Sequence, residues 1–194
     1  MRVRTLLVAA LIAAGASRAA AAGAGARAEV VAGVGGTTAV EGEPGDGGAS
    51  LSLSLLWPLE DHFRFGLMGF ADDLGQRRGR LVAPGGFDLG PVAEVHRAAI
   101  GAAWRMEAHL PSVGAYDSFV AATWGAYRVT DDVRGATTQT LDAAGFGLGF
   151  GLARRVAGAH GAGITLRYQQ LSRGAAQRYL SAAVEWRWHR RATE

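Results

Sequence analysis

The amino-acid sequence predicts an all-β protein, an eight-stranded antiparallel transmembrane β-barrel whose strands meander up and down. After residue 28 the chain contains eight segments of 9–11 residues in which large apolar side chains alternate with small or polar ones. Alternation with period two is typical of β-strands, because successive side chains point to opposite faces. A tilted strand of about 9–11 residues crosses a bilayer, and an even number of strands suits closure.

The first 28 residues have the pattern of a signal peptide. Arg2 and Arg4 precede an apolar stretch at 6–14, and small residues with Ala-x-Ala cleavage options end at Ala22 and Ala28. The apolar stretch is shorter than the about 20 residues of a transmembrane helix, so we expect cleavage and export. We therefore divide the chain into a signal peptide (1–28), a barrel (29–188) and a short periplasmic tail (189–194).

Charge and composition exclude several classes of function. The first 28 residues hold four of the 20 arginines, so 16 arginines face 17 acidic residues in the rest of the chain. This near balance gives nucleic-acid binding no electrostatic basis. The chain contains no cysteine, which excludes disulfides and thiolate metal sites. We expect no cofactor and no metal.

The eight segments follow one another with connections of two kinds. In order, the segments lie at about 28–36, 49–57, 63–72, 96–106, 117–127, 142–152, 162–170 and 179–188. The connections after the second, fourth and sixth segments are 58–62, 107–116 and 153–161. Those after the first, third, fifth and seventh are 37–48, 73–95, 128–141 and 171–178, and are longer overall. Transmembrane barrels have short periplasmic turns and longer outer loops, so we place the second set outside the cell.

Most segments have one clearly apolar face. The first is too rich in glycine to orient, and in the fifth Phe119 and Tyr127 share a face with Thr123. The apolar faces of the third, fourth, sixth, seventh and eighth segments hold, in that order, Phe63, Phe65 and Leu67; Ala98, Ile100, Ala102, Trp104 and Met106; Phe146, Leu148, Phe150 and Leu152; Ile164, Leu166 and Tyr168; and Leu180, Ala182, Val184, Trp186 and Trp188.

Packing decides whether the apolar faces point into the barrel or out of it. A soluble lipocalin-type barrel would turn them inward, but the interior of an eight-stranded barrel is only just wide enough for side chains. The opposite faces carry glycine, alanine, serine and a few charges, which suit a narrow lumen. We therefore expect the apolar faces to contact lipid.

The C-terminal segment resembles the assembly signal of a known family. Its residues 181–188 read Ser-Ala-Ala-Val-Glu-Trp-Arg-Trp, a polar and small start followed by alternating aromatics. In this and in its strand pattern the chain resembles the small OmpA/OmpX-type outer-membrane barrels of Gram-negative bacteria. That family typically ends on the last aromatic, whereas residues 189–194 follow here. The resemblance implies an outer-membrane location, assembly through the outer-membrane machinery and a monomer.

Three groups of side chains are candidates for function. Charges on the inward faces predict a salt-bridged network in the lumen, because a buried charge is costly unless it is paired; they are Arg64, Arg105, Glu107, Arg167, Glu185 and Arg187. Aromatics near the periplasmic ends predict an aromatic girdle; they are Trp57, Phe63, Trp104, Trp186 and Trp188. Arginines in the longest outer loop, Arg77, Arg78 and Arg80, are candidates for contact with lipopolysaccharide phosphates.

These candidates favour a structural or interaction role over two alternatives. A lumen filled by arginine and glutamate would pass little, and the outer loops would meet lipopolysaccharide or an external partner. The first alternative is a narrow channel for small or hydrophobic solutes. The second is a lipid-modifying enzyme of the outer membrane, but none of the five histidines forms a recognisable motif with a serine. We therefore expect no catalysis.

Overall fold

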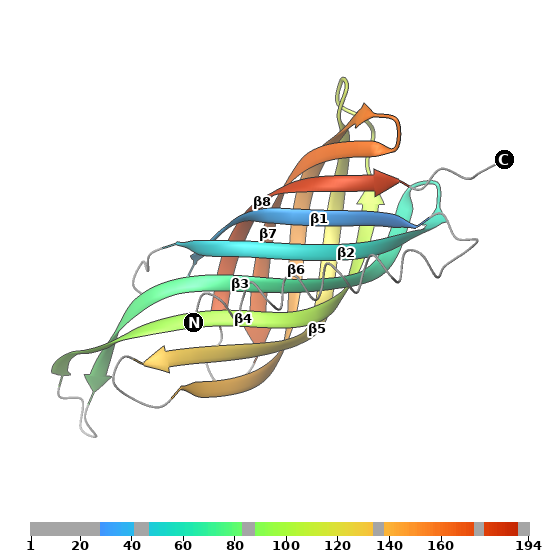
Figure 1. Ribbon diagram of the computed structural model, residues 1–194. Helices are drawn as coiled ribbons and strands as arrows, with labels where there is room; N and C mark the ends of the chain where they lie inside the picture. The colour runs from blue at the N-terminus through green and yellow to red at the C-terminus, as the bar shows by residue number, and fades with distance from the viewer. Residues whose placement is uncertain (1–27, 41–46, 83–87, 134–137, 173–176, 190–194) are drawn as a thin grey trace.

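The protein is a closed antiparallel barrel of eight strands (Figure 1). The computed structural model describes residues 28–40, 47–82, 88–133, 138–172 and 177–189. The strands are β1 (Glu29–Ala39), β2 (Gly48–Glu60), β3 (Phe63–Val82), β4 (Asp88–His109), β5 (Asp117–Val133), β6 (Gln139–Ala157), β7 (His160–Ser172) and β8 (Gln177–His189). Each strand pairs with its neighbours in sequence, which confirms the predicted meander. No helix among the described residues is long and apolar enough to span a membrane.

The first and last strands close the barrel. β1 and β8 lie side by side in Figure 1 and pair from Glu29 opposite His189 to Ala39 opposite Tyr179. Closure leaves the sheet without an edge, so every strand finds hydrogen-bonding partners on both sides. A structure that crosses lipid needs this, because unpaired backbone groups are costly where no water is present.

The large apolar side chains point outward. On β6, Phe146 is 47% exposed, Leu148 60% and Phe150 48%, whereas the glycines between them face the lumen. The same alternation runs along β8, where Val184 is exposed and Glu185 is buried. The large apolar side chains of these strands thus lie on the exterior, and the prediction that these faces contact lipid rather than fill the lumen fits the structure.

The glycine face of β6 makes room for side chains from other strands. A Cβ atom added at Gly151 would lie 2.2 Å from Cζ of Phe119, and one at Gly147 would lie 2.6 Å from the hydroxyl of Thr123. At Gly149 the added atom would lie 2.9 Å from Cγ of Arg167. Alternating glycine therefore lets bulky groups lie against the wall of a narrow barrel.

The strands are longer than predicted at one end of the barrel. β3 continues to Val82 and β4 begins at Asp88, so most of the segment 73–95, expected to be a loop, is a strand hairpin. Pairing shifts register at three places in this hairpin, and Gly75 has a positive φ of 78°. These bulges interrupt the two-residue alternation, which is why the sequence pattern ends before the strands do. We call this end of the barrel the hairpin end.

The opposite end carries the chain reversals after β2, β4 and β6, and we call it the turn end. Two residues, Asp61 and His62, join β2 to β3, and Gly158 with Ala159 joins β6 to β7. Gly158 has a φ of 54°, a conformation that glycine adopts without a steric penalty. The connection between β4 and β5 is longer, and it contains Gly114 with a φ of 62°.

Candidate functional site in the lumen

Charged side chains from opposite walls meet in the lumen near the turn end. Arg105 and Glu107 come from β4, and Glu185 and Arg187 come from β8, four strands away around the barrel. In each pair the two residues are separated by one position, so both point to the inner face. All four side chains are at most 2% exposed.

These four groups form a continuous ion-pair network. Arg187 donates to both carboxylate oxygens of Glu107, at 2.9 and 3.1 Å, and to Glu185 at 2.8 Å. Arg105 donates to Glu185 at 2.9 Å and lies 2.5 Å from Glu107. Paired donors and acceptors of this kind are among the stronger hydrogen bonds in proteins, and they fix the geometry as well. The network thus joins the two walls across the lumen.

Glu29, Arg64 and Ser54 extend the network around the wall. Glu29 at the start of β1 accepts a hydrogen bond from Arg187 at 3.4 Å and another from Arg64 of β3. Arg105 also donates to the hydroxyl of Ser54 on β2, at 3.2 Å. Three arginines and three glutamates therefore balance in charge, which reduces the cost of burying them.

An aromatic ring covers the network on one side. The guanidinium of Arg187 lies 4.3 Å from the centroid of the Phe119 ring, which is a cation–π contact. Phe119 is fully buried and faces the lumen together with Thr123 and Tyr127. The fifth segment thus mixes aromatic and polar residues on one face because that face packs inside the barrel.

Arg167 lies in the lumen but apart from the network. Its side chain is 3% exposed, and its Nη1 donates to the sulfur of Met68 at 3.1 Å. Among the described residues, no carboxylate lies within ion-pair distance of Arg167. Of the six charges expected to form one network, five belong to it and Arg167 does not, because it lies two inward positions beyond the level of Glu185.

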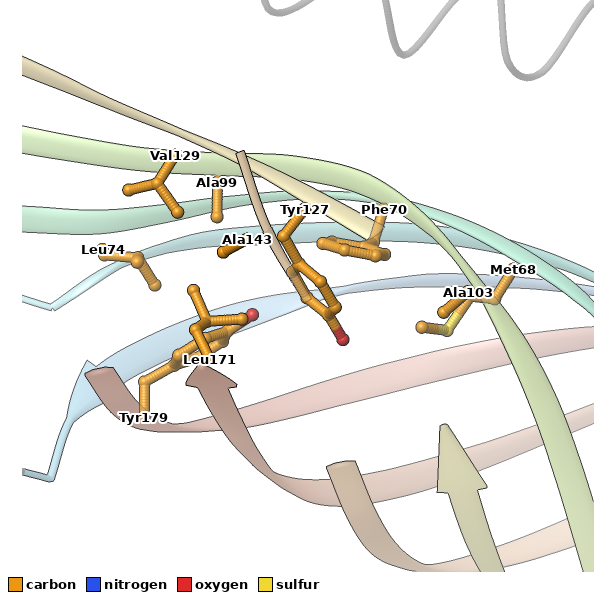
Figure 2. Close-up of a cluster of buried hydrophobic side chains, with 10 residues drawn as sticks. All are labelled: Met68, Phe70, Leu74, Ala99, Ala103, Tyr127, Val129, Ala143, Leu171 and Tyr179. Atoms are coloured by element: carbon orange, nitrogen blue, oxygen red, sulfur yellow. The ribbon is translucent and has the colours of Figure 1, made fainter. Parts of the chain in front are cut away.

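From the ion network toward the hairpin end, the lumen is filled by an apolar cluster. Figure 2 shows these side chains in the space that the strands enclose; they are Met68, Phe70, Leu74, Ala99, Ala103, Tyr127, Val129, Ala143, Leu171 and Tyr179. Phe70 and Tyr127 have ring centroids 4.6 Å apart. This cluster is a core inside the barrel, and it lies toward the hairpin end.

One carboxylate is held within this apolar region. Asp72 is 2% exposed, and its two oxygens accept hydrogen bonds from Ser50 at 2.6 Å and from Tyr179 at 2.9 Å. The neighbouring Asp73 points to the other face, where it lies 3.1 Å from His96. The two adjacent aspartates therefore cannot share a metal ion, and the described residues contain no group of three or more metal-ligating side chains.

Sequence reasoning missed Glu29 and the aromatic lumen residues. Glu29 starts a glycine-rich strand without a clear face, and its position follows only from the pairing of β1 with β8. Phe70 and Tyr127 are large residues on a face that otherwise carries small ones. They fit because Gly101 lies beside Phe70 and Gly145 beside Tyr127. Gly101 is directly opposite Phe70, whereas Gly145 lies diagonal to Tyr127, which is opposite Ala143.

The aromatics expected to form a girdle all lie on the outer face. Phe63 and Trp188 are near the turn end, with Phe63 opposite Ala108 and Trp188 opposite His160. Trp57, opposite Phe65, and Trp186, opposite Ala162, each lie two residues farther in. Trp104 lies deeper still, opposite Leu67 and Trp124, and its ring stacks on Phe65 with centroids 5.1 Å apart.

The arginines expected in an outer loop lie on β3 instead. In the hairpin, Arg77 is opposite Val95, Arg78 opposite Glu94 and Arg80 opposite Pro91. The register thus places all three on the part of the β3–β4 hairpin that extends beyond the pairing of β3 with β2, which ends at Asp72.

Comparisons with known proteins identify the fold. No family model matches the chain, and no curated protein matches it in sequence. Among solved structures, Neisserial surface protein A aligns with a TM-score of 0.60 and 16% identity, covering 83% of this chain and 96% of its own. Ail of Yersinia pestis aligns with a TM-score of 0.53 and 7% identity, covering 85% of this chain and 99% of its own. The N-terminal barrel domain of OprF from Pseudomonas aeruginosa aligns with a TM-score of 0.51 and 14% identity, covering 83% and 96%.

These neighbours are small barrels, and the one from Yersinia pestis is matched over nearly its whole length. The apolar exterior, the closed meander and these alignments together support the predicted location in the bacterial outer membrane. The chain has the fold of the small eight-stranded outer-membrane barrels, the class that its sequence resembles.

Proposed function

We propose that this protein is a non-conducting outer-membrane barrel with a structural or interaction role, inserted as a monomer. The observation that carries the proposal is the ion-pair network that joins β4 to β8 across the lumen. An ion or solute on the barrel axis would have to part Arg105 and Arg187 from Glu107 and Glu185. Breaking a buried pair costs about 3–5 kcal/mol, and several pairs share these four groups.

Electrical recording in planar lipid bilayers tests the closed lumen. The purified protein is expected to give no stable single-channel steps under voltages at which a porin control conducts. The double variant Arg105→Ala, Arg187→Ala removes both bridging cations and is the matched test for the role of the network. Stable steps from the wild-type protein would instead favour the narrow channel, the alternative function.

We further propose that the β3–β4 hairpin contacts lipopolysaccharide phosphates. Arg77, Arg78 and Arg80 follow one another on the part of β3 that extends past β2. Guanidinium groups bind phosphate through paired, charge-assisted hydrogen bonds. In a membrane with one leaflet of lipopolysaccharide, such a position at the headgroup level would fix the barrel in that leaflet.

Binding of purified lipopolysaccharide to the barrel in detergent tests this contact. The triple variant Arg77→Gln, Arg78→Gln, Arg80→Gln is expected to bind at least about tenfold more weakly at low salt, because charge-assisted bonds to phosphate are lost. The control is Arg154→Gln, Arg155→Gln on β6 at the turn end, which should leave the affinity unchanged. Equal affinity of the triple variant and the wild type would exclude the hairpin as the binding site.

No catalytic role is proposed. Among the described residues, no serine hydroxyl is hydrogen-bonded to a histidine. His109 lies 3.6 Å from Glu107 and its ring packs against Phe119, whereas His96 pairs with Asp73 on the outer face. The described histidine contacts are therefore with carboxylates and rings rather than with a nucleophile.

A further inference from the structure

Buried polar atoms without hydrogen-bond partners lie at two levels of the lumen: in and beside the ion network, on Arg105, His109 and Arg187, and at mid-height beyond it. Five atoms at mid-height are inaccessible to solvent and make no hydrogen bond in the structure: Nη2 of Arg167, Nε2 of Gln169, Oγ1 of Thr123, Oγ1 of Thr165 and Oγ of Ser181. All five residues are at most 3% exposed. Buried polar groups in proteins nearly always have a partner, so a cluster of exceptions indicates something that the protein atoms alone do not supply.

Strand pairing places the five residues next to one another. Thr165, Arg167 and Gln169 are successive inward positions of β7, and Ser181 of β8 is directly opposite Arg167. Thr123 and Gln169 come together over Gly147, since a Cβ atom there would lie 2.6 Å from the hydroxyl of Thr123 and 2.5 Å from Oε1 of Gln169. The five groups therefore line one stretch of the lumen, which we call the mid-lumen layer.

The layers above and below enclose this one. Along β8 the inward side chains are Arg187 and Glu185 of the ion network, then Ala183 and Ser181, then Tyr179 of the apolar cluster. Ser181, and Arg167 opposite it, thus lie between the ion network and Tyr179 of the apolar cluster. A group held there would be shielded from bulk water.

The chemistry of the five atoms selects an anion. The guanidinium nitrogen and the amide nitrogen can only donate hydrogen bonds, and the three hydroxyls can donate as well. The carbonyl oxygen of Gln169 already accepts from the hydroxyl of Tyr127 at 3.0 Å. A cation would find no lone pair on Arg167 or on Nε2 of Gln169, whereas an anion could accept a hydrogen bond from either nitrogen.

The charge of Arg167 points the same way. The three glutamates of the ion network are paired with Arg64, Arg105 and Arg187, which leaves them balanced. Asp72 accepts its two hydrogen bonds from neutral hydroxyls and is not within ion-pair distance of Arg167. A buried cation with no counter-charge in contact is costly in a low-dielectric interior, and a bound anion removes that cost.

We propose that the mid-lumen layer binds a small monovalent inorganic anion, such as chloride, with Arg167 as its charged ligand. The hydroxyl of Ser181, directly opposite Arg167 on β8, is the further donor that the strand register places beside it. Because the layers on both sides are closed, the ion is held as a structural component and stabilises the folded barrel.

Unfolding of the purified barrel at constant ionic strength tests the proposal. Wild-type protein in sodium chloride or bromide is expected to be more stable than in sodium gluconate, whose anion is too large for the layer. At a halide concentration ten times the dissociation constant, mass action lowers the unfolded fraction about tenfold. Arg167→Met is expected to lose this dependence on halide. The control Arg128→Gln removes an exposed cation that pairs with Asp142 on the outer face, and it should keep the dependence.

Two results would overturn the anion site. Equal stability in halide and gluconate would mean that water alone fills the layer, and halide dependence that survives in Arg167→Met would place the effect elsewhere. Should Arg167→Met fail to fold, anomalous diffraction from wild-type crystals grown in bromide decides the matter. A bromide peak within hydrogen-bonding distance of Arg167 supports the site, and its absence at occupied halide concentrations refutes it.

Discussion

Adding one methyl group at Gly151 tests the inward packing of the glycine face directly. The Cβ atom of Gly151→Ala would lie 2.2, 2.6 and 2.8 Å from three carbons of the Phe119 ring. Carbon atoms in contact are normally about 3.5–4.0 Å apart, so the ring or the strand must move by more than about 1 Å. The ring is fully buried and lies against the guanidinium of Arg187, so it has little freedom to move.

The expected cost follows from this contact. Overpacking of a buried position destabilises by about 1–3 kcal/mol, and we expect the upper part of that range here. With a urea slope of about 1–3 kcal/mol per molar, the unfolding midpoint should fall by roughly 1 M. The assay is urea unfolding of the purified barrel in lipid vesicles, followed by tryptophan fluorescence.

A control and a second variant make the test specific. Gly36→Ala on β1 adds the same methyl group on the outer face, where the nearest atom is a backbone oxygen 3.4 Å away, and it should change the midpoint little. In a Phe119→Ala background, which itself costs about 3–5 kcal/mol, the added penalty of Gly151→Ala should vanish. The inward packing of this face is refuted if Gly151→Ala is no more destabilising than Gly36→Ala.

Three further substitutions, measured by the same unfolding assay, test the ion network, the lipid-facing surface and the hydrogen bond to the buried Asp72. Glu107→Gln leaves the buried Arg105 and Arg187 short of a counter-charge, and it should destabilise the barrel by about 3–5 kcal/mol; a loss below about 1 kcal/mol would contradict a paired network. Leu148→Arg places a charge on the lipid-facing surface and should cost about 2–4 kcal/mol in a bilayer, with no such cost if that face met water. Tyr179→Phe removes the hydrogen bond to Asp72 and should cost about 1–3 kcal/mol, because a buried carboxylate oxygen loses its donor; unchanged stability would show that this bond contributes nothing.

Side-chain alternation made the fold predictable from the sequence. Each segment had to bury one face and present the other to lipid, and a period of two reports that choice locally, as Phe146 to Leu152 illustrates. The hairpin end was not predictable in this way. Beyond Asp73 the strands of the β3–β4 hairpin pair with each other through bulges and leave the pattern that contact with lipid imposes.

The charge network was predictable in part because the cost of burial requires partners. Four of the charges point inward and lie near one end of their strands: Arg105, Glu107, Glu185 and Arg187. Pairing across the lumen is therefore the arrangement that leaves none of them buried without a counter-charge. Arg167 is predicted near mid-height from its place in the seventh segment, but whether it reaches the network depends on the stagger between strands rather than on its own sequence. Stagger is a property of the closed barrel, and no single strand encodes it.

The reactivity of single cysteines tests the central claim, a lipid-facing exterior around a closed lumen, most directly. The chain has no cysteine, so Ala183→Cys and Val184→Cys each introduce the only thiol, one on the lumen face and one on the outer face of β8. In barrels folded in lipid vesicles, Val184→Cys should react with a maleimide that partitions into lipid and not with a charged, water-soluble one. Ala183→Cys should react with neither until the protein is unfolded. Rapid modification of Ala183→Cys by the water-soluble reagent in the folded barrel would show an open, water-filled lumen and contradict the account.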